Sequence, residues 1–187
     1  LWRHLLGRSC CLKHAEKALV DGASGAGADC AETTGGEAIG HVSVATQAWD
    51  ASCPDITIGG AVIPRLIDEL VVLGALAAVY PGQTLVKDAE ELRVKESDRV
   101  VETVRILRAF GVEAEECPDG FLVRGGKPLQ AAELDVSSDH RVAMSAAVLA
   151  CAAEGESVLH GFDVAGVSYP GFVDVLKQLG AHVTTSA

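Results

Sequence analysis

The sequence predicts an α/β domain built from repeated units of helices and short strands. The first observation is an internal repeat with an offset of 73 residues, which places Gly82 on Gly155 and Val94 on Val167. The second is that each copy has an Ala-rich apolar stretch before the glycine and an amphipathic stretch after the valine. The third is composition, since 49% of the 187 residues are hydrophobic, enough to form a core at this length.

Charge and hydropathy exclude several classes of protein. A net charge of −11 argues against a general affinity for nucleic acid, because phosphate backbones bind clustered Lys and Arg. The longest apolar run, residues 70–80, is shorter than the roughly 20 residues needed to cross a bilayer, so no membrane span is predicted. Six cysteines without a CxxC pair indicate reduced thiols and a cytoplasmic protein.

The first copy is predicted to contain two helices and several strands. Its first helix is nearly all apolar, as expected of a buried helix, and its second is amphipathic and ends at Gly111 in the position of a C-terminal cap. Turn signals containing Pro, Gly and Asp separate the later strands. The predicted elements are a helix over 65–79, a strand over 84–87, a helix around 100–107, and strands over 112–115, 121–124 and 133–136.

The second copy is predicted to begin with a helix over 139–153 and to end in an amphipathic stretch that is four residues shorter than in the first copy. The first sixty residues show only weak similarity to a third copy of the repeat. There we expect only a helix around 11–20 and strands over 39–45 and 56–58. The glycine-rich stretch 22–27 lacks the residue order of a phosphate-binding loop and is predicted to be a linker.

The repeat places three clusters of polar residues near helix N-termini, which suggests one shared site. In the first cluster, Arg65 and Glu69 have the i, i+4 spacing of a helical ion pair, leaving Asp68 among apolar residues without an obvious partner. Asp68 is therefore a candidate for chemistry. The alternative is a structural carboxylate that accepts N–H groups in the first helical turn.

In the second cluster, Lys95 and Arg99 are like charges with i, i+4 spacing at a predicted helix start. Such cations repel each other unless an anion lies between them, and a helix N-terminus also favours anions. Glu96 would then be a carboxyl group available for proton transfer. The alternative is a solvated helix face with Glu96–Arg99 and Arg99–Glu102 ion pairs.

In the third cluster, a capping serine is followed by Asp139, His140 and Arg141 at the start of an apolar helix. His140 could be protonated beside an anion, and the planar guanidinium of Arg141 fits a carboxylate or phosphate. In the repeat Arg141 falls on Asp68, so one structural position carries a base in one copy and a cation in the other. The alternative is a helix cap and a surface ion pair.

Four stretches occur in one order: IPRLIDEL at 63–70, DAEELRVKESDR at 88–99, SDHRVAM at 138–144 and VSYPGF at 167–172. In these motifs, and in the 28-residue step from Asp68 to Glu96, the chain resembles the 5-enolpyruvylshikimate-3-phosphate synthase family. The resemblance covers residues 35–187 and leaves residues 1–34 unaligned. It implies an inside-out, barrel-like α/β domain of βαβαββ units, with helices inside and sheets outside. We expect residues 1–187 to form a single domain similar to the family's C-terminal domain.

The resemblance implies a transferase of the shikimate pathway for aromatic amino acid biosynthesis. It would move the enolpyruvyl group of phosphoenolpyruvate to the 5-hydroxyl of shikimate 3-phosphate, releasing phosphate without a metal or organic cofactor. The herbicide glyphosate would compete with phosphoenolpyruvate. By the resemblance Asp68 contacts the 5-hydroxyl, Glu96 protonates the methylene carbon and Lys95 shares the proton transfers. The implied substrate-binding residues are Arg99 and Arg141, which hold phosphoenolpyruvate, and His140 beside them.

The sequence also departs from the family. Val71 replaces a proline of many relatives, and Val167 replaces a lysine that binds phosphoenolpyruvate in some of them. Motifs of the family's N-terminal domain, which hold shikimate 3-phosphate, are absent. An alternative is therefore a folded half-enzyme that binds phosphoenolpyruvate or glyphosate and needs a complementing N-terminal domain or a homodimer for turnover. A further alternative is the related enolpyruvyl transfer to UDP-N-acetylglucosamine, although the motifs favour the shikimate branch.

Overall fold

The computed structural model describes residues 30–34, 37–40 and 53–185. The chain divides into two compact units, one formed by residues 50–187 with the first three residues, the other by residues 4–49. In the second unit, strands β1 (Cys30–Thr34) and β2 (Glu37–Gly40) pair antiparallel. The helix predicted over 11–20 and the glycine-rich stretch 22–27 lie outside the described residues. The single domain expected over residues 1–187 stays a prediction.

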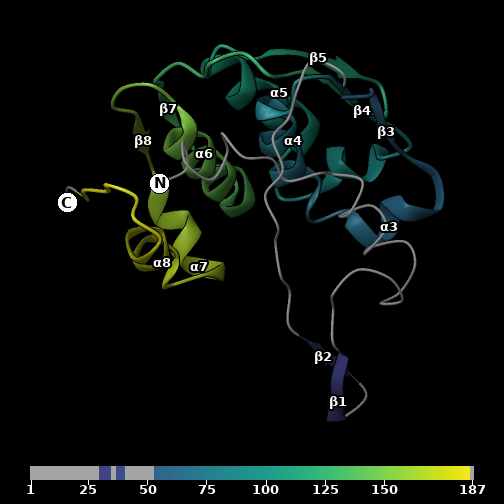
Figure 1. Cartoon of the computed structure of the whole chain (residues 1–187), viewed down its shortest axis with the longest axis horizontal. Coiled ribbons are helices and arrows are strands. Elements are labelled where there is room, and N and C mark those ends of the chain that lie inside the picture. The colour runs from purple at the N-terminus through teal and green to yellow at the C-terminus, as the bar shows by residue number, and fades with distance from the viewer. Residues whose placement is uncertain (1–29, 35–36, 41–52, 186–187) are drawn as a thin grey trace. The chain divides into compact units, whose positions relative to one another are not determined.

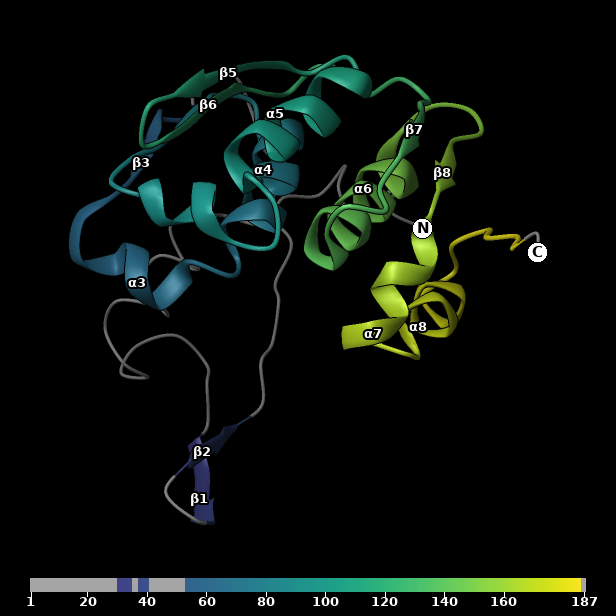
Figure 2. The ribbon, with the colours of Figure 1, turned by 180° about the vertical axis from the view of Figure 1, so that it is seen from behind.

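The first repeat copy forms a four-stranded mixed sheet with the order β3-β4-β6-β5. Strand β3 runs parallel to β4, whereas β6 runs antiparallel to both β4 and β5. The sheet lies on the outside of helices α4 and α5 (Figures 1 and 2). The strands are β3 (Ile56–Ile58), β4 (Gln83–Val86), β5 (Glu113–Cys117) and β6 (Gly120–Arg124).

The helices of this copy lie close to the predicted positions, with one correction. The helix predicted over 65–79 is wrong as a single element, because a turn at residues 67–69 divides it. There the N–H of Glu69 donates to the carbonyl of Leu66, only three residues back, which tightens the chain. The elements are a 3-10 turn at Gly60–Val62, α3 (Ile63–Leu66), α4 (Leu70–Val79), a 3-10 turn at Glu90–Val94 and α5 (Arg99–Ala109).

The second copy pairs two parallel strands beside a long central helix. Helix α6 packs against α4, and because both are largely apolar they form the centre of the core. Leu70, Val142 and Ala146 on these helices are completely buried. The elements are β7 (Glu133–Asp135), α6 (His140–Ala152), β8 (Val158–His160), a 3-10 turn at Phe162–Val164, α7 (Ala165–Ser168) and α8 (Phe172–Gln178).

The backbone supports the predicted repeat at the ends of its amphipathic helices, where the second copy is four residues shorter and the offset is therefore 69 residues. Helices α5 and α8 end in the same way, because Gly111 and Gly180 both have a positive φ, 79° and 93°. Each glycine donates its N–H to a carbonyl three residues back, Arg108 for Gly111 and Lys177 for Gly180. Among the described residues, no helix has the length and apolar character needed to cross a membrane.

Gly125 in the first copy tests how tightly the backbone is packed there, and Gly166 in the second copy is an open position for comparison. A Cβ atom at Gly125 would lie 2.0 Å from the carbonyl oxygen of Ala77, whereas one at Gly166 would meet nothing within 4 Å. Because backbone atoms cannot move aside cheaply, we expect Gly125→Ala to lower the free energy of unfolding by about 1–3 kcal/mol. Gly166→Ala is the matched control and should be neutral within about 1 kcal/mol. Urea unfolding followed by circular dichroism measures both, and equal losses would contradict the packing described.

Candidate active site

A buried arginine joins the polar residues that the sequence singles out. The side chain of Arg99 is only 1% exposed, and all its hydrogen bonds go to carboxylates. Its Nε donates to Asp139 Oδ2 at 2.8 Å, its Nη1 to Asp68 Oδ1 at 3.1 Å and its Nη2 to Glu96 Oε2 at 2.6 Å. Asp68 and Glu96, 28 residues apart, therefore meet at one guanidinium.

Asp139 binds the buried side of the Arg99 guanidinium group. Its carboxylate is completely buried, caps α6 by accepting the N–H of Arg141 at 2.8 Å, and pairs with Arg99. Burial alone would raise the pKa of Asp139, but the bonds from Arg99 and from the Arg141 backbone hold it below its ordinary value. Burial likewise opposes the charge of Arg99, yet the bond to Asp139 and the nearby carboxylates raise the pKa of Arg99 above its ordinary value.

The two residues that coincide in the repeat are in contact. Arg141 Nη2 lies 3.2 Å from Asp68 Oδ2, and its Nη1 donates to the Asp68 carbonyl oxygen at 3.1 Å. That carbonyl is available because the turn at residues 67–69 interrupts the helical hydrogen bonds. The Nε of Arg141 is buried and has no partner among the described residues, so this arginine retains one donor.

The segment that carries Lys95 and Glu96 is tied to the sheet by Arg93. Arg93 Nη2 donates to the Cys117 carbonyl at 2.6 Å and its Nε to the Pro118 carbonyl at 2.9 Å, both at the turn between β5 and β6. Its Nη1 bonds to Asp98, the N-cap of α5, at 2.8 Å. Lys95 pairs with Glu91. These bonds fix both ends of the loop between the 3-10 turn and α5.

The structure joins four of the six predicted site residues by direct contacts that the sequence did not predict: Asp68, Glu96, Arg99 and Arg141. Lys95 lies before the N-cap of α5, so Lys95 and Arg99 are not on one helix face, and the expected paired-cation anion site is wrong in that form. Asp68 is not unpartnered, since both arginines reach it from other elements. The predicted Glu96–Arg99 pair is confirmed. His140 lies beside the cluster, with its Nδ1 3.9 Å from Asp139 Oδ1.

Two other expected ion pairs do not form among the described residues. Glu102 pairs with Arg105 at 2.6 Å, not with Arg99. No bond joins Arg65 to Glu69 among the described contacts, because the turn at 67–69 breaks the helical spacing that the pair requires. The helix cap of the third cluster is Asp139 itself, so α6 begins at His140 and not at 139.

Arg93 and Asp139 are the functional residues that sequence reasoning missed. An acidic residue just before an apolar helix is a signal for an N-cap, so the sequence could have predicted that Asp139 caps α6. Its pairing with Arg99, 40 residues away, depends on how α5 and α6 pack. The same holds for Arg93, whose acceptors are backbone carbonyls 24 and 25 residues ahead.

This cluster joins residues of the two repeat copies and combines carboxylate groups with guanidinium groups. The family model of EPSP synthase (3-phosphoshikimate 1-carboxyvinyltransferase) matches residues 13–176. The chain belongs to the EPSP synthase family. The match begins upstream of residue 35, where the motifs alone placed its start.

Curated relatives carry the same description. The chain is 46% identical over 122 residues to the 3-phosphoshikimate 1-carboxyvinyltransferase of Pelotomaculum thermopropionicum, covering 65% of this chain and 28% of that protein. It is 45% identical over 145 residues to the enzyme of Roseiflexus castenholzii, covering 78% of this chain and 33% of the relative. The chain thus spans about a third or less of the length of these relatives.

A solved structure of EPSP synthase from Acinetobacter baumannii has the same fold. It superposes with a TM-score of 0.72 at 29% identity, covering 86% of this chain and 38% of that one. The similarity confirms the predicted α/β fold class of the enolpyruvyl transferases, and the family agrees with the one that the motifs indicate.

The buried pair can be tested by removing one partner and then both. Arg99→Met leaves the Asp139 carboxylate buried and uncompensated, so we expect a loss of about 3–5 kcal/mol in the free energy of unfolding. Arg99→Met combined with Asp139→Leu replaces the pair by apolar groups and should recover most of that loss. Urea unfolding of the single and double variants measures the coupling, and additive losses would contradict a direct pair.

The lowered pKa of Asp139 predicts a pH dependence of stability. In the unfolded chain this carboxyl has its ordinary pKa of about 3.9, so the unfolded state binds more protons in acid. The stabilisation is therefore complete above about pH 5 and is lost as the pH falls through the folded-state pKa. Unfolding of wild type between pH 5 and pH 2.5 should weaken more steeply than that of Arg99→Met/Asp139→Leu. Parallel pH profiles would show that Asp139 is not the titrating group.

Proposed function

We propose that the chain carries the acid–base half of an enolpyruvyl transferase site, and acts on phosphoenolpyruvate and shikimate 3-phosphate. The observation that carries the proposal is the convergence of Asp68 and Glu96 on the guanidinium of Arg99. Arg99 is buried, whereas the side chains of Asp68 and Glu96 remain 44% and 56% exposed. Both carboxylates are thus bound by the buried Arg99 on one side and are accessible to a ligand from the solvent side.

The proposed reaction needs one proton accepted and one donated in each of two steps. Asp68 accepts the proton of the 5-hydroxyl as its oxygen attacks C2 of phosphoenolpyruvate, and Glu96 gives a proton to C3. In the second step Glu96 removes a proton from C3, the C2–O bond to phosphate breaks as Asp68 returns its proton to the leaving phosphate oxygen, and the enol ether double bond forms.

The cationic side chains have two proposed roles: some bind phosphoenolpyruvate, and one positions the two carboxylates. Arg141, with its unpaired Nε, and Lys95 are the proposed contacts for the phosphate and carboxylate of phosphoenolpyruvate, with His140 beside them. Arg99 mainly positions the two carboxylates. Arg99 also contacts substrate when Glu96 moves away and the Nη2 of Arg99 donates to the carboxylate of phosphoenolpyruvate instead. Glyphosate, which is also anionic, is the proposed competitor.

A half-enzyme is the second candidate, and the length comparison favours it. The chain covers 27–33% of the relatives described as 3-phosphoshikimate 1-carboxyvinyltransferase. Holding two substrates in attack geometry contributes about 7–11 kcal/mol, which an open half-site forfeits. Turnover would then require a complementing N-terminal domain or a second copy. The free thiols of Cys53, Cys117 and Cys151 support a cytoplasmic location for either form.

Phosphate release from phosphoenolpyruvate and shikimate 3-phosphate tests the proposal, with the chain alone and with an added N-terminal domain of a relative. We expect Glu96→Gln to lower release at least about 100-fold, as for loss of a general acid–base group. Glu90→Gln is the matched control and should leave release unchanged, because Glu90 is exposed and has no ion pair with any residue in the described part of the chain.

Three results are informative. Release by the chain alone that Glu96→Gln abolishes supports the transferase proposal. Release only with the added domain supports the half-enzyme. Absence of release with the added domain, together with no binding of phosphoenolpyruvate or glyphosate by calorimetry, would contradict both.

A further inference from the structure

The proposed proton-transfer residues Lys95 and Glu96 lie on a loop that packs little against the core. We call residues 88–98 the site segment, because it carries both residues and ends at the N-cap of α5. Within it Val94 is 78% exposed, and the side chain of Glu96 is 56% exposed. Since few apolar contacts hold these residues, the conformation of residues 94–97 depends largely on the bonds at the two ends of the loop.

The start of the site segment is bonded to the turn between β5 and β6, residues 117–120, which we call the outer turn. The N–H groups of Asp88 and Ala89 donate to Asp119, to its Oδ2 and its carbonyl oxygen respectively, both at 2.7 Å. Asp88 has a positive φ of 59°, and its side chain accepts the N–H of Gly60 at 2.8 Å. A residue with a Cβ atom keeps this conformation where its surroundings enforce it, so the start of the segment is held firmly.

Arg93 bonds the middle of the site segment to the same turn and to the end of the segment. Its Nη2 and Nε donate to the carbonyl oxygens of Cys117 and Pro118 at 2.6 Å and 2.9 Å. Its Nη1 donates to Oδ2 of Asp98, the N-cap of α5, at 2.8 Å. The bond between Arg93 and Asp98 therefore closes the loop 94–97 against the end of a helix, which restricts the conformations of a loop this short.

The outer turn is itself fixed to the sheet. A Cβ atom at Gly120 would lie 2.1 Å from the carbonyl oxygen of Val86, so the turn packs directly against the backbone at the end of β4. The turn also joins β5 to β6, which pair along their whole length from Glu113 to Cys117. Because it is part of a packed sheet, the outer turn provides a rigid attachment for the site segment.

We propose that Arg93 is a positioning residue for proton transfer, which holds Lys95 and Glu96 in place by bonding the site segment to the outer turn. Among the described residues Arg93 has no bond to either of them, so it acts through the backbone of the loop. Its planar guanidinium group reaches two carbonyls and a carboxylate at once, which a lysine ammonium group cannot do in the same geometry. The proposal rests on the function proposed above, in which Lys95 and Glu96 exchange protons with substrate.

Arg108 provides a matched control. Its Nε donates to the carbonyl oxygen of Ala114 on β5 at 2.9 Å, so Arg108, like Arg93, connects to a backbone carbonyl of that strand. Arg108 lies in the last turn of α5, at the opposite end of the helix from the site segment. Arg93→Met and Arg108→Met therefore remove the same kind of bond, but only Arg93→Met frees the loop 94–97.

Phosphate release by the chain with the added N-terminal domain measures the effect on proton transfer. We expect Arg93→Met to lower kcat about 10- to 100-fold, the range for misplacing reacting groups by about 1 Å. The KM for phosphoenolpyruvate should rise no more than about threefold, because the proposed contacts Arg141 and His140 lie on α6. Arg93→Lys should lose nearly as much kcat as Arg93→Met, whereas Arg108→Met should change neither constant. Equal losses of kcat in Arg93→Met and Arg108→Met, or no loss in either, would overturn the proposal.

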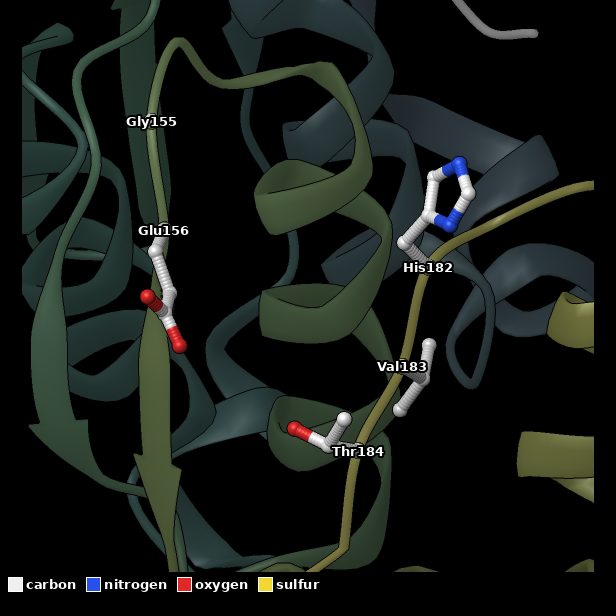
Figure 3. A pocket seen from close by; sticks show the side chains of 5 residues that line it. All are labelled: Gly155, Glu156, His182, Val183 and Thr184. Atoms are coloured by element: carbon white, nitrogen blue, oxygen red, sulfur yellow. The ribbon is translucent and has the colours of Figure 1, made fainter.

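Backbone order parameters from ¹⁵N relaxation of the full chain test the positioning without turnover. The amides of residues 94–97 should have order parameters of about 0.85 in wild type and Arg108→Met, and below about 0.6 in Arg93→Met. Internal references are the residues that line a cavity of the second copy and have no bond to the site segment within the described ranges (Figure 3): Gly155, Glu156, His182, Val183 and Thr184. Their order parameters should be equal in all three proteins. Unchanged order at residues 94–97 in Arg93→Met would overturn the proposal whatever the rate of release.

The two measurements separate this proposal from the proposed function. Release by wild type that Arg93→Met leaves intact would contradict the role of Arg93 alone, and the proposed function would stand. Loss of order at residues 94–97 in Arg93→Met, with neither release nor phosphoenolpyruvate binding by wild type, would contradict the proposed function. Arg93 would then have a structural role only, and its role in proton transfer would be refuted as well.

Discussion

The site depends on one buried ion pair, Arg99 with Asp139, which connects the starts of helices α5 and α6. Two charges removed from water are costly, and a well-packed apolar pair would stabilise the core as well or better. The pair instead fixes the positions of the groups bound to it. From the buried end Asp139 also caps α6, and at the other end Arg99 holds Asp68 and Glu96, which come from different elements of the fold. The geometry of the two carboxylates, which we propose as the proton-transfer groups, is thus set by the packing of the core.

The repeat explains why complementary charges occur at this place. Two copies of one unit bring equivalent positions together, and there one copy carries Asp68 while the other carries Arg141, in contact at 3.2 Å. Equal residues at those positions would repel each other or leave an unpaired charge. Divergence of the two copies therefore provides both the carboxylate and the guanidinium of the site.

Much of this could be predicted from the sequence, because periodicity and turn residues are local signals. The repeat, the ends of α5 and α8 and the strands of the first copy follow from such patterns, and four ordered motifs indicate the family. The partners of Asp68 could not be predicted, since its nearest cations in sequence are not those that reach it in space. The break at residues 67–69 and the roles of Arg93 and Asp139 likewise depend on long-range contacts that no local pattern encodes.

The central claim, that Arg99 and Asp139 position the acid–base groups, is tested most directly by a crystal structure of Arg99→Met/Asp139→Leu. The account predicts that the packing of α4, α5 and α6 is retained while the carboxylates of Asp68 and Glu96 no longer converge. If both carboxylates keep their present positions without the buried pair, the site is organised by other contacts and the claim is wrong.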